Sequence, residues 1–154
     1  MASAGAGHTV PLRSDGSAVG VDDNQCAQGN LPARDNDVAY VQVSAGGAHA
    51  ILIRSDGRAV AAGDNSCTQC DIPQLEDGVN YVQSAAGSWH TVLLRSDGRA
   101  VACGSNDYEQ CNLPEAHLNH KFCQVYAGQN HTVLLRKGCG PWRQQLRPVQ
   151  CANA

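Results

Sequence analysis

The chain has 154 residues, a formal net charge of −3 and 42% hydrophobic residues, which suits one globular domain of modest size. No run of basic residues supplies the positive stripe that phosphate neutralisation requires, so we expect no nucleic-acid binding by this segment. The N-terminal MASAGAGHTV lacks the regions of a signal peptide, and no stretch suits a membrane span. We therefore expect a cytoplasmic or nuclear location without membrane contact.

The chain contains eight cysteines. They are Cys26, Cys67, Cys70, Cys103, Cys111, Cys123, Cys139 and Cys151. In a small secreted protein such a number would indicate disulfides, but the sequence shows no secretory signal. We predict free thiols and a reducing compartment.

A set of histidines recurs at a constant spacing of 41 residues. Each histidine follows an Ala-Gly-x-x element and precedes an arginine by five residues, and a Ser-Asp-Gly triplet follows that arginine in the first three units. The repeated histidines are His8, His49, His90 and His131. A constant period of this size indicates stacked supersecondary units, because one unit cannot bury its own apolar faces.

The first unit departs from the pattern. Pro11 replaces a leucine of the later units, and Asp22 replaces a glycine. Because proline cannot donate to a strand ladder, we predict an edge or a decaying repeat here. The chain also begins inside a unit, without the Tyr-Val-Gln strand of the later units, so this unit is predicted to lack its first strand.

The segment 64–80 has little strand character and carries Cys67-x-x-Cys70, Pro73 and Asp77-Gly78. We interpret it as the connection between two units. Since it is long for a structureless loop, we expect a short outer strand within it.

The following unit predicts three strands, over 81–85, 89–94 and 99–103. Asp97-Gly98 separates the last two and is a strong hairpin signal, because glycine adopts positive φ freely. The middle strand is apolar on both faces, which indicates a sheet covered on both sides. We therefore predict an all-β fold, a partial β-propeller of three to four antiparallel blades with three strands in each 41-residue repeat.

The pattern stops after Arg136. The sequence KGCGP replaces the expected Ser-Asp-Gly hairpin, and the following WRQQLRPVQCANA matches no unit. The last blade is thus predicted to lack its third strand. We predict propeller repeats over 1–136, with the first and last units incomplete, and a non-repeating tail over 137–154.

The combined pattern Tyr-Val-Gln-x-x-Ala-Gly-x-x-His-Thr-x-Leu-Leu-Arg-Ser-Asp-Gly-x-Ala-Val-Ala-x-Gly-x-Asn-x-x-x-Gln-Cys-x-x-Pro resembles the compact repeat of the regulator-of-chromosome-condensation family, over about residues 4–136. The resemblance implies a propeller, usually closed by seven units. It also implies the functions of the family: nucleotide exchange on a nuclear small GTPase, recognition modules of HERC-type ubiquitin ligases, and a secreted bacterial β-lactamase inhibitor.

The chain holds somewhat under four units, about half of such a ring. A half-ring leaves apolar blade faces exposed. The sequence is therefore expected to be a fragment, a divergent gene product, or a protomer that closes by association with itself or with the rest of a larger propeller.

Three groups of residues suggest metal or redox chemistry. One histidine per unit is also what packing and backbone hydrogen bonding produce, so we expect the repeated histidines to be structural. Cys67 and Cys70 have zinc or redox spacing, but the pair does not recur, so we expect neither role. His117 and His120 beside Cys123 form a non-repeated cluster, for which a solvated loop and adventitious metal binding stay open. We assign no catalytic, cofactor-binding or metal residue, and we expect that the chain is not an enzyme.

Partner contacts are expected in the loops that vary between units, at 33–39, 74–80 and 115–121. The predicted partner-binding residues are Arg34, Asp35, Glu76, Asp77, Glu115, His117, His120 and Lys121. We predict a non-catalytic protein-interaction module, in its specific form the recognition part of a HERC-like ubiquitin ligase or a scaffold. The alternatives are a guanine-nucleotide exchange factor for a small GTPase, which needs loop insertions that the constant spacing lacks, and a secreted enzyme inhibitor of the β-lactamase-inhibitor type.

Overall fold

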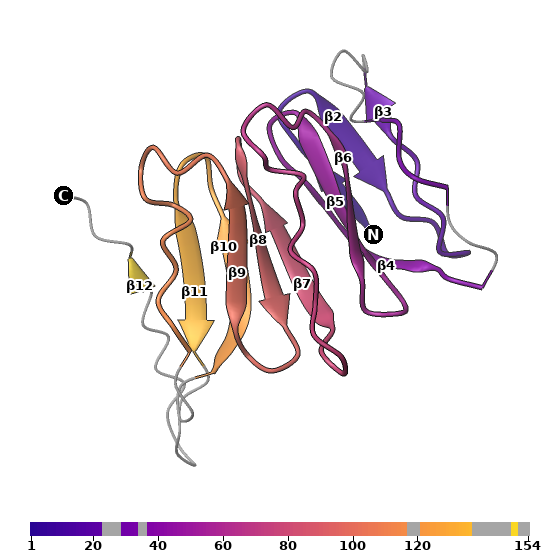
Figure 1. The fold of residues 1–154 in the computed structure, drawn as a ribbon. Helices are drawn as coiled ribbons and strands as arrows, with labels where there is room; N and C mark the ends of the chain where they lie inside the picture. Colours follow the sequence, from indigo (N-terminus) through magenta and orange to yellow (C-terminus); the bar gives the residue numbers. More distant parts are fainter. Residues whose placement is uncertain (23–28, 34–36, 117–120, 137–148, 151–154) are drawn as a thin grey trace, which may run out of the picture.

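The computed structural model describes residues 1–22, 29–33, 37–116, 121–136 and 149–150. Its described strands form four three-stranded antiparallel sheets that stand side by side in chain order (Figure 1). The predicted all-β partial propeller is thus confirmed, and we call the sheets blades 1 to 4. No helix long and apolar enough to cross a membrane occurs in the described part of the chain.

Each blade has its second strand in the centre, paired antiparallel with the other two. Blade 1 contains β1 (Ala2–Ala4), β2 (His8–Pro11) and β3 (Val21–Asp22); blade 2 contains β4 (Tyr40–Ala45), β5 (His49–Arg54) and β6 (Ala59–Gly63); blade 3 contains β7 (Tyr81–Ala86), β8 (His90–Arg95) and β9 (Ala100–Gly104); blade 4 contains β10 (Phe122–Ala127), β11 (Thr132–Arg136) and β12 (Val149–Gln150). The three strands predicted for the third unit are confirmed within a residue.

Two expectations about the outer blades are wrong. The first unit does not lack its first strand: β1 pairs with β2, and Ala2 lies opposite Pro11 as Ser84 lies opposite Leu93 in blade 3. The last blade does not lack its third strand, because β12 pairs with β11 through Leu134 and Val149. A strand ladder uses backbone groups, so both strands form without the side-chain pattern of the repeat.

The connection 64–80 contains no strand, so the expected short outer strand is wrong. Its first half is instead a turn held by side chains. Asn65 donates through Nδ2 to Oδ1 of Asp71 at 2.9 Å, and its own Oδ1 accepts from the backbone N–H of Cys70 at 2.8 Å. Thr68 has a φ of 65°, and Glu109 has a φ of 60° at the equivalent place in the next connection.

The predicted hairpins at the Ser-Asp-Gly triplets are present. Gly57 and Gly98 adopt φ of 80° and 85°, which an L side chain rarely adopts. In blade 3, Oδ1 of Asp97 accepts from the backbone N–H of Arg99 at 3.0 Å and closes the turn. These hairpins place the second and third strands of a blade in a fixed register.

The core lies between the blades, because the middle strands of blades 2 and 3 carry buried side chains on both faces. We call the face that packs against the following blade the leading face, and the face that packs against the preceding blade the trailing face. Between blades 2 and 3, Ile51 and Ile53 of the leading face pack on Leu93 and Tyr81 of the trailing face, and all four are buried. Clusters of the same kind join blades 1 and 2 and blades 3 and 4.

Candidate functional site

Two of the repeated histidines, His49 and His90, form hydrogen bonds with the next blade. Nε2 of His49 lies 2.9 Å from Oγ1 of Thr91 on the next blade, and both residues are fully buried. The Thr91 hydroxyl donates its single proton to the carbonyl of Gln69 at 2.8 Å. That hydroxyl can therefore only accept from His49, so the ring carries its proton on Nε2.

His90 repeats this arrangement one blade further. Its Nε2 lies 3.1 Å from Oγ1 of Thr132, which donates to the carbonyl of Gln110 at 2.7 Å. Burial, and next the charge of His90, lower the pKa of His49 to about 4; burial, and next His131, lower the pKa of His90 to about 4. Both rings are neutral at pH 7. Among the described residues, no group of three or more histidine, cysteine or acidic side chains is arranged to hold a metal ion.

His8 differs from these two histidines. It is buried, but neither ring nitrogen has a hydrogen-bond partner among the described residues. The position that Thr91 and Thr132 occupy on the later blades is Ala50 on blade 2. Because Ala50 has no hydroxyl, His8 lacks the hydrogen bond to the next blade that His49 and His90 make.

The described cysteines are free thiols. Burial, followed by the charges of Asp64 and Asp71, raises the pKa of Cys70 to about 11. Burial, followed by Cys111 and Cys70, raises the pKa of Cys103 to about 12. A reactive redox cysteine needs a lowered pKa, so these thiols suit a structural role. The remaining cysteines, Cys26, Cys139 and Cys151, lie outside the described residues.

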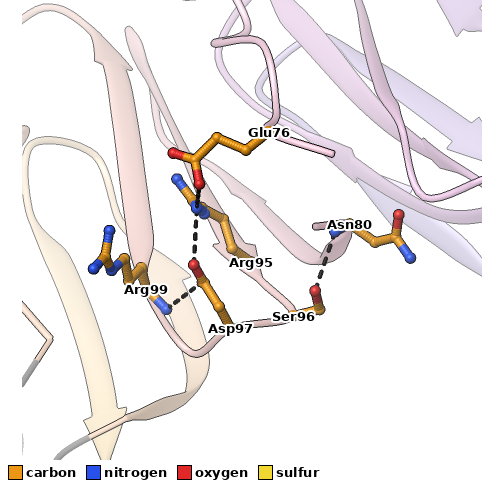
Figure 2. Close-up of polar contacts among 6 residues, drawn as sticks. All are labelled: Glu76, Asn80, Arg95, Ser96, Asp97 and Arg99. Atoms are coloured by element: carbon orange, nitrogen blue, oxygen red, sulfur yellow. Dashed lines mark hydrogen bonds and ion pairs between the residues drawn. The ribbon is translucent and has the colours of Figure 1, made fainter. Parts of the chain in front are cut away.

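The described ends of the predicted partner-binding loops lie beside the Ser-Asp-Gly hairpins, at one edge of the blades. We call it the hairpin edge; it consists of the Ser-Asp-Gly hairpins and the ends of the connections beside them. Figure 2 shows its part on blade 3, where the Asn80 N–H donates to Oγ of Ser96 at 3.1 Å. The Ser96 N–H returns a bond to the Asn80 carbonyl at 2.7 Å. Ala39 and Ser55 make the same two bonds on blade 2. Backbone bonds therefore fix this edge in place.

Charged side chains cover this fixed backbone. Arg95 makes an ion pair of 2.8 Å with Asp97 and reaches Glu76 at 3.4 Å (Figure 2). Partial burial opposes ionisation of Asp97, but hydrogen bonds from the Arg99 backbone and from Arg95 lower its pKa. The Glu76 side chain is 74% exposed, so its carboxylate can also contact a partner.

The structure describes four of the eight predicted partner-binding residues. Glu76, Asp77, Glu115 and Lys121 are all exposed. Lys121 lies against the hairpin glycine Gly98 of the preceding blade. The other four, Arg34, Asp35, His117 and His120, lie outside the described residues.

Two exposed aromatic residues at one edge of blade 3 were not identified from the sequence. Trp89 is 43% exposed and Tyr108 is 67% exposed. Trp89 precedes β8 and Tyr108 follows β9, so both belong to the edge of blade 3 opposite its hairpin. The sequence held a signal for them, because the equivalent positions of the preceding unit are Ala48 and Cys67.

A pocket of about 330 Å³ lies where the connection 64–80 passes blade 2. Arg58 and Ala59 form one side, and Ile72, Pro73 and Leu75 of the connection contribute to the other. Tyr81 closes it and donates its hydroxyl proton to the Pro73 carbonyl at 2.6 Å. The walls of the pocket are largely aliphatic, and Arg58 supplies one positive charge. No serine, threonine, cysteine or lysine among the described residues lines it.

Residues 40–69 and 82–110 match the family model of the regulator of chromosome condensation (RCC1) repeat. No curated protein is significantly similar to the chain in sequence.

Solved structures share the fold. Yeast RCC1 (Prp20), in a crystal structure with Kap60 bound to it, has a TM-score of 0.73 and 20% identity over 88% of this chain and 41% of that one. Human WBSCR16 has a TM-score of 0.73 and 21% identity over 88% and 45% of the two chains. The CRINKLY WD40 ectodomain of the Arabidopsis thaliana receptor kinase ACR4 has a TM-score of 0.66 and 20% identity over 89% and 45%. The chain spans less than half the length of each.

Proposed function

We propose that this chain, which carries regulator-of-chromosome-condensation repeats, is a non-catalytic module that binds protein partners through its hairpin edge. One observation carries the proposal: the backbone of this edge is fixed by the same bonds in blades 2 and 3, while the exposed side chains of the connections beside the hairpins differ from one unit to the next. A rigid scaffold that presents variable loops is the usual arrangement for recognition.

The chemistry of the described side chains supports a non-catalytic role. The repeated histidines His49 and His90 are buried and neutral, and the raised pKa of Cys70 and of Cys103 keeps both thiols protonated. General acid–base or nucleophilic chemistry needs a group with a matched pKa that a substrate can reach. These histidines and thiols therefore suit packing within the fold rather than catalysis.

The similar yeast protein suggests which partners to test. Kap60 is bound to Prp20 in one crystal structure, and a second structure was described together with the binding of Prp20 to Gsp1p and to histones. Binding of the chain to purified core histones and to Gsp1p should be measured by biolayer interferometry. Glu76→Lys should change the affinity for a bound partner by about tenfold, because the substitution reverses a charge within the proposed interface. The matched control Glu109→Lys, exposed at the opposite edge, should change it less than about twofold. An equal effect of both variants would refute the hairpin edge as the site.

Guanine-nucleotide exchange is the second candidate, favoured by the likeness to Prp20 in fold. The interaction module is preferred because β4, β7 and β10 begin at a constant spacing, which leaves no insertion to enter a nucleotide site. Release of a fluorescent guanine nucleotide from a purified small GTPase decides between them: acceleration by the chain would establish exchange, and binding without acceleration supports the module.

The finer assignments remain proposals. We propose membership of a HERC-like ubiquitin ligase or a scaffold, and a cytoplasmic or nuclear location. Transfer of ubiquitin to a bound partner by the full-length protein, and imaging of the tagged protein in cells, test these two proposals separately.

A further inference from the structure

The boundaries between blades obey one directional contact rule. A glutamine on the leading face bonds to backbone groups on the trailing face of the next blade. Nε2 of Gln83 donates to the Val125 carbonyl at 2.9 Å, and Oε1 of Gln83 accepts from the Val125 N–H at 3.0 Å. Oε1 of Gln42 accepts from the Ser84 N–H at 2.9 Å. In each of these three bonds, the glutamine side chain belongs to the blade that comes first in the chain.

The histidines and serines follow the same direction. His49 and His90 on leading faces reach threonines on trailing faces. Oγ of Ser3 accepts from the Ala45 N–H at 2.9 Å. Because all these bonds run from one blade to the next, the two faces of a blade are chemically different and complementary.

The described part of the chain contains no blade after blade 4, so the leading face of blade 4 has no partner within it. Gln124 and His131 occupy the positions of Gln83 and His90 and are exposed, and their side chains make no hydrogen bond to another described residue. Tyr126 on the same strand as Gln124 is 48% exposed. This face therefore carries the side chains of a blade boundary and leaves them unmatched in the described part of the chain.

Blade 1 presents the complementary trailing face. Ala2 lies opposite Pro11 as Val125 lies opposite Leu134, so its backbone stands where the glutamine of a preceding blade would bond. Thr9 occupies the position of Thr91 and Thr132, and both Ala2 and Thr9 are exposed. The trailing face of blade 1 thus offers both a hydroxyl that can accept from a histidine, on Thr9, and backbone groups that can bond to a glutamine, at Ala2.

We propose that the leading face of blade 4 docks on the trailing face of blade 1 of a second copy of this chain. The contact would continue the boundary that already joins the blades, with Gln124 on the backbone of Ala2 and His131 on the hydroxyl of Thr9. Such a contact is heterologous: two copies that meet reciprocally form a ring, and otherwise copies add in a row. The inference is independent of the proposed function, because it uses the faces of the blades and not the hairpin edge.

The directional contact gives a sharp test by complementation. Analytical ultracentrifugation from about 1 µM to about 1 mM should show wild-type species of at least twice the 16.2 kDa chain mass. Thr9→Arg and Gln124→Arg, each alone, should weaken association at least about tenfold, because every contact then includes a blocked face. An equimolar mixture should associate again, because the intact leading face of one variant meets the intact trailing face of the other.

The controls separate docking from folding. Glu109→Arg, exposed away from both faces, should associate like the wild type, and circular dichroism should show the same β content in all variants. His131→Asp serves as a second leading-face variant. A wild type that stays monomeric throughout the range would overturn the proposal. So would a mixture that fails to recover, since the leading and trailing faces would then not complement each other. A Thr9→Arg chain that associates normally would overturn it as well, since this would indicate a contact that does not use the trailing face.

Discussion

His49 donates from Nε2 to Oγ1 of Thr91 across 2.9 Å, and this single hydrogen bond connects the middle strands of blades 2 and 3. Thr91 in turn holds the connection between these blades through the carbonyl of Gln69. The Gln69 side chain is itself buried and bonds the Cys67 N–H and the Asp64 carboxylate. One buried chain of polar groups thus couples strand, neighbouring blade and loop.

Removal of the His90 ring should destabilise the fold without affecting any chemical activity. We expect His90→Ala to lower the free energy of unfolding by about 1–3 kcal/mol, because its buried partner Thr132 loses a donor. Urea unfolding measures the loss. In a double-mutant cycle with Thr132→Val the two losses should not add. Tight stoichiometric metal binding through His49, His90 and His131 would contradict the structural role.

Acid should destabilise the fold in the pH range of the buried histidines. The pKa of His49 and of His90 falls from 6.5 to about 4 on folding, so the unfolded chain binds more protons between these values. Stability is therefore complete above pH 6.5 and is lost as the pH falls towards 4, by about 3 kcal/mol per histidine over the whole window.

This window is separate from that of the carboxylates. The pKa values of Asp56, Asp64 and Asp97 lie below 3.8, so their contribution is lost only at lower pH. Urea unfolding at pH 7, 6, 5 and 4.5 should show the slope, and His90→Gln should remove about half of it. A flat profile above pH 4.5 would contradict burial of neutral rings.

The period and the hairpins could be predicted from the sequence, because they depend on local residues. The Asp97-Gly98 turn needs a positive φ at glycine, and the middle strands need apolar residues on both faces. The outer strands β1 and β12 could not be predicted, because backbone pairing alone forms them. The partners of His49 and His90 were also missed, since each lies 42 residues away on another blade.

The partner-binding residues were predicted from variation between units alone. That reasoning identified exposed loop residues such as Glu76 and Lys121. It could not show that Glu76 reaches Arg95, because their contact joins a connection to a hairpin. It also passed over Trp89 and Tyr108, whose exposure depends on where the strands begin and end.

All eight thiols should titrate after denaturation without reductant. The five described cysteines are free, and the raised pKa of Cys70 and Cys103 makes both poor nucleophiles in the native state. Alkylation at pH 8 should therefore label these two last, as peptide mass mapping can show. Two or more native disulfides in protein isolated from cells would indicate a secreted relative of the inhibitor type.

Ala50→Thr should stabilise the chain by supplying the hydroxyl that His8 lacks. Blades 3 and 4 hold threonine at this position, and His8 is buried with both ring nitrogens unpartnered among the described residues. A new hydrogen bond to a buried ring is worth about 1 kcal/mol. Thermal and urea unfolding should both show the gain.

The control for this substitution is Ala50→Val, which has the same shape without the hydroxyl. Because Ala50 is fully buried, added volume alone can cost stability, and the valine measures that cost. The Thr variant should exceed the Val variant by about 1 kcal/mol, and the difference should vanish in a His8→Ala background, where no ring remains to donate. Equal stability of the two variants with His8 present would show that the hydroxyl does not reach the ring, and that the polar chain begins only at blade 2.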